Sequence, residues 1–133
     1  MKNFIKYASN RIVSDVIVTG YLDSETPPVF HPMYDRIYFV IEDSTFEIYI
    51  NDDGFVQSKK IVDIAEWFEV DDDDCFSLMS IYSQAFKTEQ EVKIKMVNYD
   101  FNSFSMVIIE YKDGDNERLL SLDPNNFFGF TFL

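Results

Sequence analysis

The sequence contains few of the residues on which covalent and metal-assisted chemistry depends. It has one cysteine, Cys75, and one histidine, His31, among 133 residues. A single cysteine excludes a disulfide within the chain and is typical of proteins from a reducing compartment. One cysteine and one histidine are also too few for a usual structural zinc site. No serine or cysteine signature surrounds His31, so the sequence does not indicate a nucleophilic triad.

Long apolar runs are absent as well. Nowhere do 18 apolar residues follow one another, so no membrane-spanning helix is predicted. The first residues, Met1 to Tyr7, carry positive charge but lack the apolar core of a secretory signal. We therefore expect a cytosolic protein. Glycine and proline number only four each, which predicts short connections between the elements.

Basic residues are scarce relative to acidic ones. The chain has 24 aspartates and glutamates against 11 lysines and arginines, and its net charge is −13. Such a charge repels nucleic acid and anionic membranes, and it favours encounter with a basic protein. We therefore expect a basic protein partner and neither a nucleic-acid nor a membrane ligand.

Apolar and aromatic residues, in contrast, are plentiful. Hydrophobic residues make up 47% of the chain, which contains 14 phenylalanines and 8 tyrosines. This composition argues against disorder. A chain of this length forms a single domain, residues 1–133, and can bury a core without a disulfide or a structural metal.

The clearest pattern lies between Arg36 and Ile50, where two runs of β-branched and aromatic residues flank a polar turn. Successive side chains of a strand point to opposite faces, so the apolar side chains of both runs share one face of a predicted hairpin. These residues are Ile37, Phe39, Ile41, Phe46, Ile48 and Ile50. The rest of the chain must cover this surface.

Further elements follow from alternation, helical spacing and turn residues. Strands are predicted over residues 12–22, 55–58, 92–96, 104–111, 118–122 and 127–133, and the proline-rich residues 23–33 are expected to form a loop. The spacing of apolar residues over 61–68 favours a short helix, with a strand as the alternative. A second helix is predicted to begin at Asp74, with an apolar stripe of Cys75, Leu78, Met79, Tyr82 and Phe86.

The predicted fold is therefore α+β. We expect a single domain with a mainly antiparallel β-sheet of about six to seven strands, covered on one face by one or two short helices. Cys75 would lie in the core as a small apolar residue, and His31 would be a partly exposed structural residue.

Carboxylates are abundant, but their spacing does not indicate an enzyme. The turns that hold Asp52–Asp53 and Asp113–Glu117 resemble calcium loops, yet neither matches the twelve-residue pattern of such a loop. No pair of carboxylates is singled out for glycoside chemistry. We expect no catalytic residue, no cofactor and no metal.

The acidic middle of the chain is more informative. Between Ile61 and Phe86 there are seven acidic residues and no lysine or arginine, so this segment carries −7 of the total charge of −13. The only tryptophan, Trp67, lies among these charges. An ordinary acidic run is a solvated face. Adjacent like charges repel one another, however, and an aromatic side chain ringed by charge is typical of a binding hot spot. Both interpretations stay open.

In size, charge and composition the chain resembles bacterial immunity proteins of contact-dependent growth-inhibition and related polymorphic toxin systems. Three segments carry the resemblance: the aromatic hairpin Ile37–Ile50, the acidic stretch Glu66–Asp74 and the ending Asp123–Gly129. The resemblance implies a stoichiometric inhibitor that binds one cognate toxin domain in the cytosol. Many such toxins are nucleases, whose active sites are basic because they hold phosphates.

If the resemblance holds, the acidic segment would bind the toxin, with Trp67 as the apolar anchor. The charged contacts would be Glu66, Glu69, Asp71, Asp72, Asp73 and Asp74, with Asp52 and Asp53 as a second patch. Two alternatives belong to other classes. One is an acidic nucleic-acid mimic that inhibits a DNA-binding protein, and the other is a small carboxylate-based enzyme.

Overall fold

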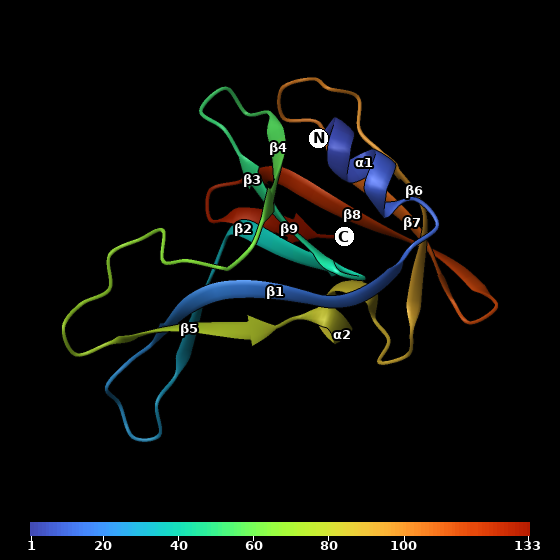
Figure 1. Cartoon of the computed structure of the whole chain (residues 1–133). Coiled ribbons are helices and arrows are strands. Elements are labelled where there is room, and N and C mark those ends of the chain that lie inside the picture. Colours follow the sequence, from blue (N-terminus) through green and yellow to red (C-terminus); the bar gives the residue numbers. More distant parts are fainter.

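The computed structural model describes residues 1–133 and consists mostly of β-strands (Figure 1). It has nine strands and two short helices. In chain order they are α1 (Lys2–Ala8), β1 (Ile12–Leu22), β2 (Phe30–Ile41), β3 (Ser44–Ile50), β4 (Val56–Ile61), β5 (Cys75–Ser80), α2 (Tyr82–Phe86), β6 (Val92–Asn98), β7 (Val107–Asp113), β8 (Asn116–Asn126) and β9 (Gly129–Phe132). Neither helix has the length or the apolar character needed to cross a bilayer.

Six of the strands form a closed barrel. Around the barrel their order is β1, β2, β9, β8, β7 and β6, and β6 returns to β1. Strand β3 pairs with residues 36–41 of β2, on the edge opposite β1, and β4 pairs in turn with β3. Strand β5 pairs with the part of β1 that β6 leaves free. The single domain is thus a barrel with strands added to it, whereas the sequence predicted one open sheet covered by helices. The difference arises because β1 and β2 are long enough to pair with different strands along their two halves.

Strand β1 shows how this sharing works. Along one edge it pairs with β2, and along the other Ile12–Val13 pair with β6 while Ile17–Leu22 pair with β5. The register between β1 and β2 shifts at two places, near Ser14 and near Val18. Such shifts, as at a β-bulge, bend strands and increase their twist. The bend allows one strand to belong both to the barrel and to the added layer.

The barrel closes where β2 lies beside β9. This contact is parallel, and its register is the single pair of Tyr34 and Gly129. The φ angle of Gly129 is +107°, and any Cβ at this position would collide with the backbone of Tyr34. Only glycine therefore permits the two strands to approach here. Next to this pair, the rings of Tyr34 and Phe132 pack edge to face with centroids 6.1 Å apart.

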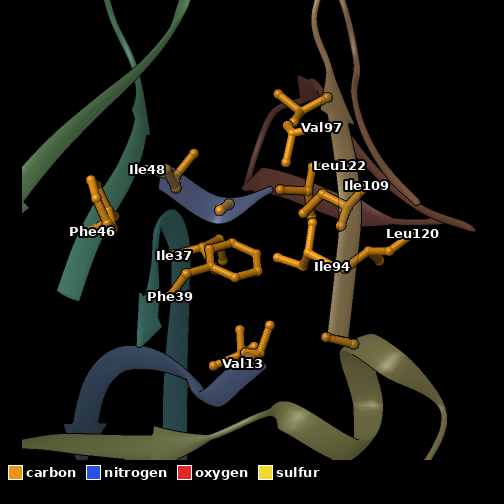
Figure 2. Close-up of a cluster of buried hydrophobic side chains, with 14 of the residues drawn as sticks. Val13, Ile37, Phe39, Phe46, Ile48, Ile94, Val97, Ile109, Leu120 and Leu122 are labelled. Atoms are coloured by element: carbon orange, nitrogen blue, oxygen red, sulfur yellow. The ribbon is translucent and has the colours of Figure 1, made fainter. Parts of the chain in front are cut away.

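The predicted hairpin at Arg36–Ile50 is confirmed and lies at the centre of the core. Phe39 pairs with Phe46 and Ile37 pairs with Ile48. Their side chains are buried together with residues from the barrel strands β6, β7 and β8 (Figure 2). Helix α1 covers the hairpin through Phe4, whose ring centroid is 5.6 Å from Phe39 and 5.4 Å from Phe46.

Both helices predicted in the middle of the chain are wrong as placed. Residues 75–80 form strand β5, because their backbone pairs with the free edge of β1, and the helix begins only at Tyr82. Cys75 is exposed rather than in the core. Residues 62–74 form no regular element after β4 ends at Ile61. Of the apolar residues with helical spacing, Ile64 and Phe68 are half-buried and Ala65 is exposed, so the spacing does not correspond to one buried face.

Strand β7 begins at Val107 rather than at residue 104, β8 extends over Asn116–Asn126, and two other boundaries also differ from prediction. Strand β2 begins at Phe30, so Pro32, expected in a loop, pairs with Gly20 in β1. The last strand begins at Gly129 rather than at residue 127, and Phe127 and Phe128 form the turn between β8 and β9. The later start of β9 moves two aromatic side chains from the sheet to the surface.

Candidate partner-binding surfaces

The predicted acidic segment is a long connection between β4 and β5, which we call the acidic arm (Val62–Asp74). In Figure 1 it leaves the barrel as a wide loop before it returns to β5. Six of its seven acidic residues are exposed, and Asp74 is half-buried. The exposed ones are Asp63, Glu66, Glu69, Asp71, Asp72 and Asp73. The structure therefore places the predicted charged contacts on one solvent-facing segment.

The fold makes no use of these charges. None of the seven carboxylates forms an ion pair within the chain, and none accepts a hydrogen bond. At the tip, the only bond is between backbone groups: the Asp74 amide donates to the Asp71 carbonyl over 2.9 Å. Four consecutive aspartates, Asp71–Asp74, thus lie side by side without a neutralising group, although like charges repel one another.

Trp67 fixes the middle of the arm to the barrel. Its indole Nε1 donates a hydrogen bond of 2.7 Å to Oγ1 of Thr19, a fully buried residue of β1. The Trp67 ring meets Phe68 edge to face at 5.0 Å, and Phe68 packs on Phe76 of β5 at 5.6 Å. Trp67 is half-buried by these contacts. It anchors the arm to its own chain, and its role as an anchor for a partner stays a prediction.

A partly buried ion pair lies next to Trp67. Arg36 lies 4.6 Å from the centre of the Trp67 ring and forms a 2.6 Å salt bridge with the buried Glu47. The Tyr38 hydroxyl donates to the same carboxylate over 3.1 Å. Burial, together with the charge of Glu47, raises the pKa of Tyr38, so this hydroxyl remains a donor. The neighbouring cavity of about 200 Å³ is smaller than a usual ligand pocket.

The second predicted patch lies elsewhere. Asp52 and Asp53 are exposed in the turn between β3 and β4, where Asn51 Oδ1 accepts hydrogen bonds from the amides of Asp53 and Phe55. The acidic arm begins at the opposite end of β4 (Figure 1). Six strand residues separate the two ends, which corresponds to about 20 Å. The structure does not bring the two predicted patches into one cluster.

The turn that holds Asp52 and Asp53 is hydrogen-bonded to a second loop, which is in turn hydrogen-bonded to a third. The sequence did not predict this arrangement. The Phe104 amide donates to the Gly54 carbonyl, and Asn125 Nδ2 donates to the Phe104 carbonyl, each over 2.9 Å. We call residues 51–55, 99–106 and 125–129 the three-loop surface. Four of its phenylalanines are exposed: Phe101, Phe104, Phe127 and Phe128. The only signal in the sequence was the doublet Phe127-Phe128 before a glycine.

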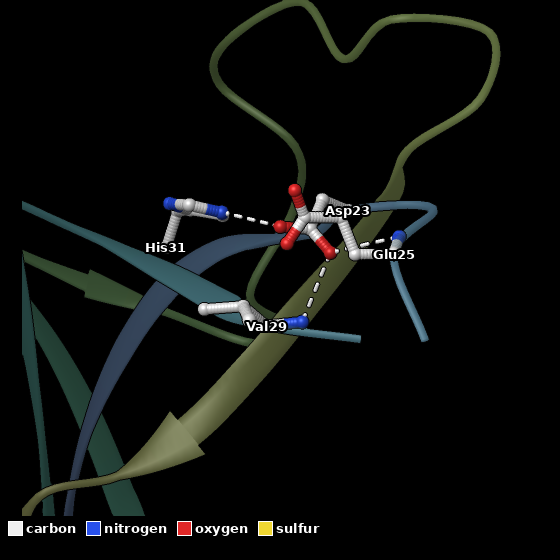
Figure 3. A network of polar contacts seen from close by, with 4 residues as sticks. All are labelled: Asp23, Glu25, Val29 and His31. Carbon is white, nitrogen blue, oxygen red and sulfur yellow. Dashed lines mark hydrogen bonds and ion pairs between the residues drawn. The ribbon is translucent and has the colours of Figure 1, made fainter. Parts of the chain in front are cut away.

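His31 and Asp23 form a separate polar network at the hairpin between β1 and β2 (Figure 3). The Asp23 carboxylate accepts hydrogen bonds from the amides of Val29 and Glu25, and its other oxygen lies 2.8 Å from His31 Nε2. The Val29 amide and His31 lower the pKa of Asp23. The His31 ring also stacks on Tyr21 at 4.7 Å. These contacts use His31 to hold the loop in place.

Comparison with known proteins adds nothing to this geometry. No protein-family model, curated protein or solved structure matches the chain. No group of three or more histidine, cysteine, aspartate or glutamate side chains is placed to hold a metal ion. The acidic arm and the three-loop surface are therefore the features from which a function can be argued.

Proposed function

We propose that this protein is an immunity protein, which binds one basic toxin domain and blocks its activity, and that the acidic arm captures the toxin. One observation carries the proposal. The arm holds seven carboxylates that the fold leaves without an ion pair or hydrogen bond. Such charges are expected to be neutralised by a partner, because they bring only mutual repulsion to the free protein.

The anchoring of the arm supports this role. A loop that is held at its middle by Trp67 loses less conformational freedom on binding than a loose one, so more of the interaction energy contributes to affinity. The carboxylates on either side of Trp67 stay in solvent, where their field reaches about 8–10 Å at ordinary ionic strength. A basic nuclease domain would be attracted by this field before contact, which speeds association.

The nucleic-acid-mimic hypothesis depends on the same charge but on a different geometry. A mimic spreads its carboxylates over a surface at phosphate-like spacing. Here more than half of the net charge lies on one arm, and the aspartates at its tip are adjacent in sequence. This concentration favours a local contact with a basic patch of a protein. The target of a mimic would be a DNA-binding host protein, and competition with DNA would reveal it.

Co-purification tests the proposal directly. The tagged protein is co-expressed with the C-terminal domain encoded by the gene immediately upstream. The affinity column that holds the tagged protein is then washed at low and at high salt. We expect a one-to-one complex that survives high salt and cells that resist the toxin domain. If this domain is neither retained nor neutralised, the proposed function is wrong. A complex that duplex DNA displaces, with no protection of the cells, would indicate the mimic instead.

A further inference from the structure

The three-loop surface exposes more aromatic area than the fold requires. Phe127 is 93% exposed and Phe128 is 76% exposed, and their rings meet edge to face at 5.1 Å. Phe104 and Phe101 add rings that are 55% and 44% exposed. Single exposed apolar residues need no explanation, but several large ones on joined loops mark an interaction site.

The turn between β8 and β9 holds its two rings outward in a fixed conformation. The Phe128 amide donates to Asn126 Oδ1 over 3.0 Å, and Asn126 Nδ2 donates to Thr131 Oγ1 over 2.7 Å. Gly129 then locks the end of the turn against Tyr34. The rings are thus presented by a braced turn, and a rigid aromatic side chain loses little entropy when it is buried by a partner.

The other two loops are braced in the same way. The Phe104 ring packs against Gly54, where any Cβ would collide with it, and Ser103 Oγ donates to the Asp53 carbonyl. Beside these loops lies a hollow of about 440 Å³ between the start of α1 and β4. Phe55, Tyr99 and Phe101 line it from the loops, and Lys2 lines it from the start of α1. This hollow is large enough to receive an apolar side chain.

The charge of the three loops indicates which kind of partner the three-loop surface binds. The three loops contain Asp52, Asp53 and Asp100, all exposed, and no lysine or arginine. An anionic membrane and a nucleic acid would both be repelled. A second copy of the chain would place like charges opposite each other, in a protein of net charge −13. A protein with an apolar patch flanked by basic side chains is complementary.

We infer that the three-loop surface is a second docking site for the same basic partner, which places an apolar patch on Phe127 and Phe128. The inference rests on the proposed function and assigns a different kinetic effect to each of the two surfaces. The acidic arm increases the rate of association, and the three-loop surface slows dissociation. The two surfaces lie about 20 Å apart along β4. A standard interface of about 800 Å² per partner spans this distance.

The test measures binding kinetics of the full-length protein with the toxin domain. We expect F127S/F128S to increase the dissociation rate at least about tenfold, with association unchanged within about twofold. The matched control, V29S/L119S, removes two exposed apolar side chains outside the three loops and should leave both rates unchanged. Circular dichroism and thermal unfolding establish that both variants fold.

Each outcome decides the inference. A wild-type complex whose dissociation F127S/F128S does not accelerate overturns the inference and leaves the proposed function intact. If the wild-type chain forms no complex, the proposed function fails and the inference falls with it. A free protein that sediments as a dimer, and becomes a monomer in F127S/F128S, assigns the surface to a second copy and also overturns the inference.

Discussion

The indole Nε1 of Trp67 and Oγ1 of Thr19 form a 2.7 Å hydrogen bond that ties the acidic arm to the barrel. Thr19 is fully buried in β1, and this is the bond through which its side-chain oxygen is satisfied. A solvent-exposed, highly charged segment is thereby attached to the barrel wall by one half-buried residue near its middle. The position of the arm depends on this contact and on the packing of Trp67 over Arg36.

Replacing Trp67 by Phe tests this attachment. An aromatic ring is kept, although a smaller one, but the Thr19 hydroxyl loses its donor, and an unsatisfied buried group costs about 1–3 kcal/mol. We expect the free energy of unfolding in urea to fall by that amount, and amide exchange in residues 62–74 to accelerate. The double variant W67F/T19V removes both ends of the bond and should recover part of the loss. If W67F is as stable as the wild type, the bond does not hold the arm.

Reversing two charges of the arm tests its role in capture. D71K/D72K should lower the association rate with the partner about tenfold at low salt and flatten the salt dependence, because the field that attracts a basic surface is weakened. The control D43K/D115K makes the same change in net charge at two exposed turn residues without ion pairs. Stopped-flow measurement of the association rate at several salt concentrations distinguishes the effect of the arm charges from the effect of net charge. Equal effects would mean that only the net charge matters.

Asp23 gives the protein a predictable response to acid. The Val29 amide, the His31 ring and the Glu25 amide hold the pKa of Asp23 below its ordinary value of 3.8. Over the interval between the two pKa values the unfolded chain binds more protons than the folded one, so stability falls as the pH is lowered. The contribution of Asp23 is fully present above the ordinary pKa and is lost as the pH falls through the folded-state pKa.

The variant D23N removes this contribution. We expect the difference in stability between the wild type and D23N to be largest near neutral pH. It should shrink once the pH falls below about 4. Urea unfolding at a series of pH values measures it. A difference that stays constant over the whole range would show that the carboxylate charge plays no part in holding the loop.

A pair of glycine substitutions tests how the barrel closes. Both Gly129 and Gly114 have positive φ angles, but only Gly129 faces the backbone of a neighbouring strand. At Gly114 the nearest atom to an added Cβ is 3.8 Å away. We expect Gly114→Ala to cost about 1 kcal/mol from backbone conformation alone. Gly129→Ala should cost considerably more, because β9 must also move away from Tyr34. Similar unfolding midpoints for the two variants would contradict this account of the closure.

The sequence predicted the central hairpin correctly because its pattern is local. Phe39 and Phe46 are brought together by alternation and one short turn, and both can be read from adjacent residues. The strands β6, β7 and β8 were predicted for the same reason. Alternation cannot show, however, that β1 returns to β6 or that Tyr34 meets Gly129. Closure of the barrel depends on such pairs, which are distant in sequence.

The errors around β5 have a different origin. Cys75, Leu78, Met79, Tyr82 and Phe86 happen to have helical spacing, but Leu78 is exposed and only Phe86 of the five is fully buried. Residues 75–80 form the edge strand of the sheet, and the backbone groups along one of their two sides pair with β1. Pairing with an available strand outweighed the local preference for a helix. Periodicity alone cannot distinguish the two cases.

The candidate surfaces were predicted only in part. The charge of the acidic arm is visible in the sequence, since it depends on consecutive residues. The role of Trp67 is not, because its partner Thr19 is far away in the chain. The three-loop surface was missed for the same reason. Phe104 and Phe127 belong to different loops, and only the fold brings those loops together.

The arrangement of the barrel strands also bears on how the chain folds. Strands β1 to β4 and strands β6 to β9 are two consecutive meanders, each built from neighbours in sequence. The only strand pairings between the two meanders are the short ones of β1 with β6 and of β2 with β9. Each meander can form early from local contacts, whereas docking of the two must await a costly chain closure. The connection at residues 87–91 is then the place where the chain could be cut and the two pieces would still assemble.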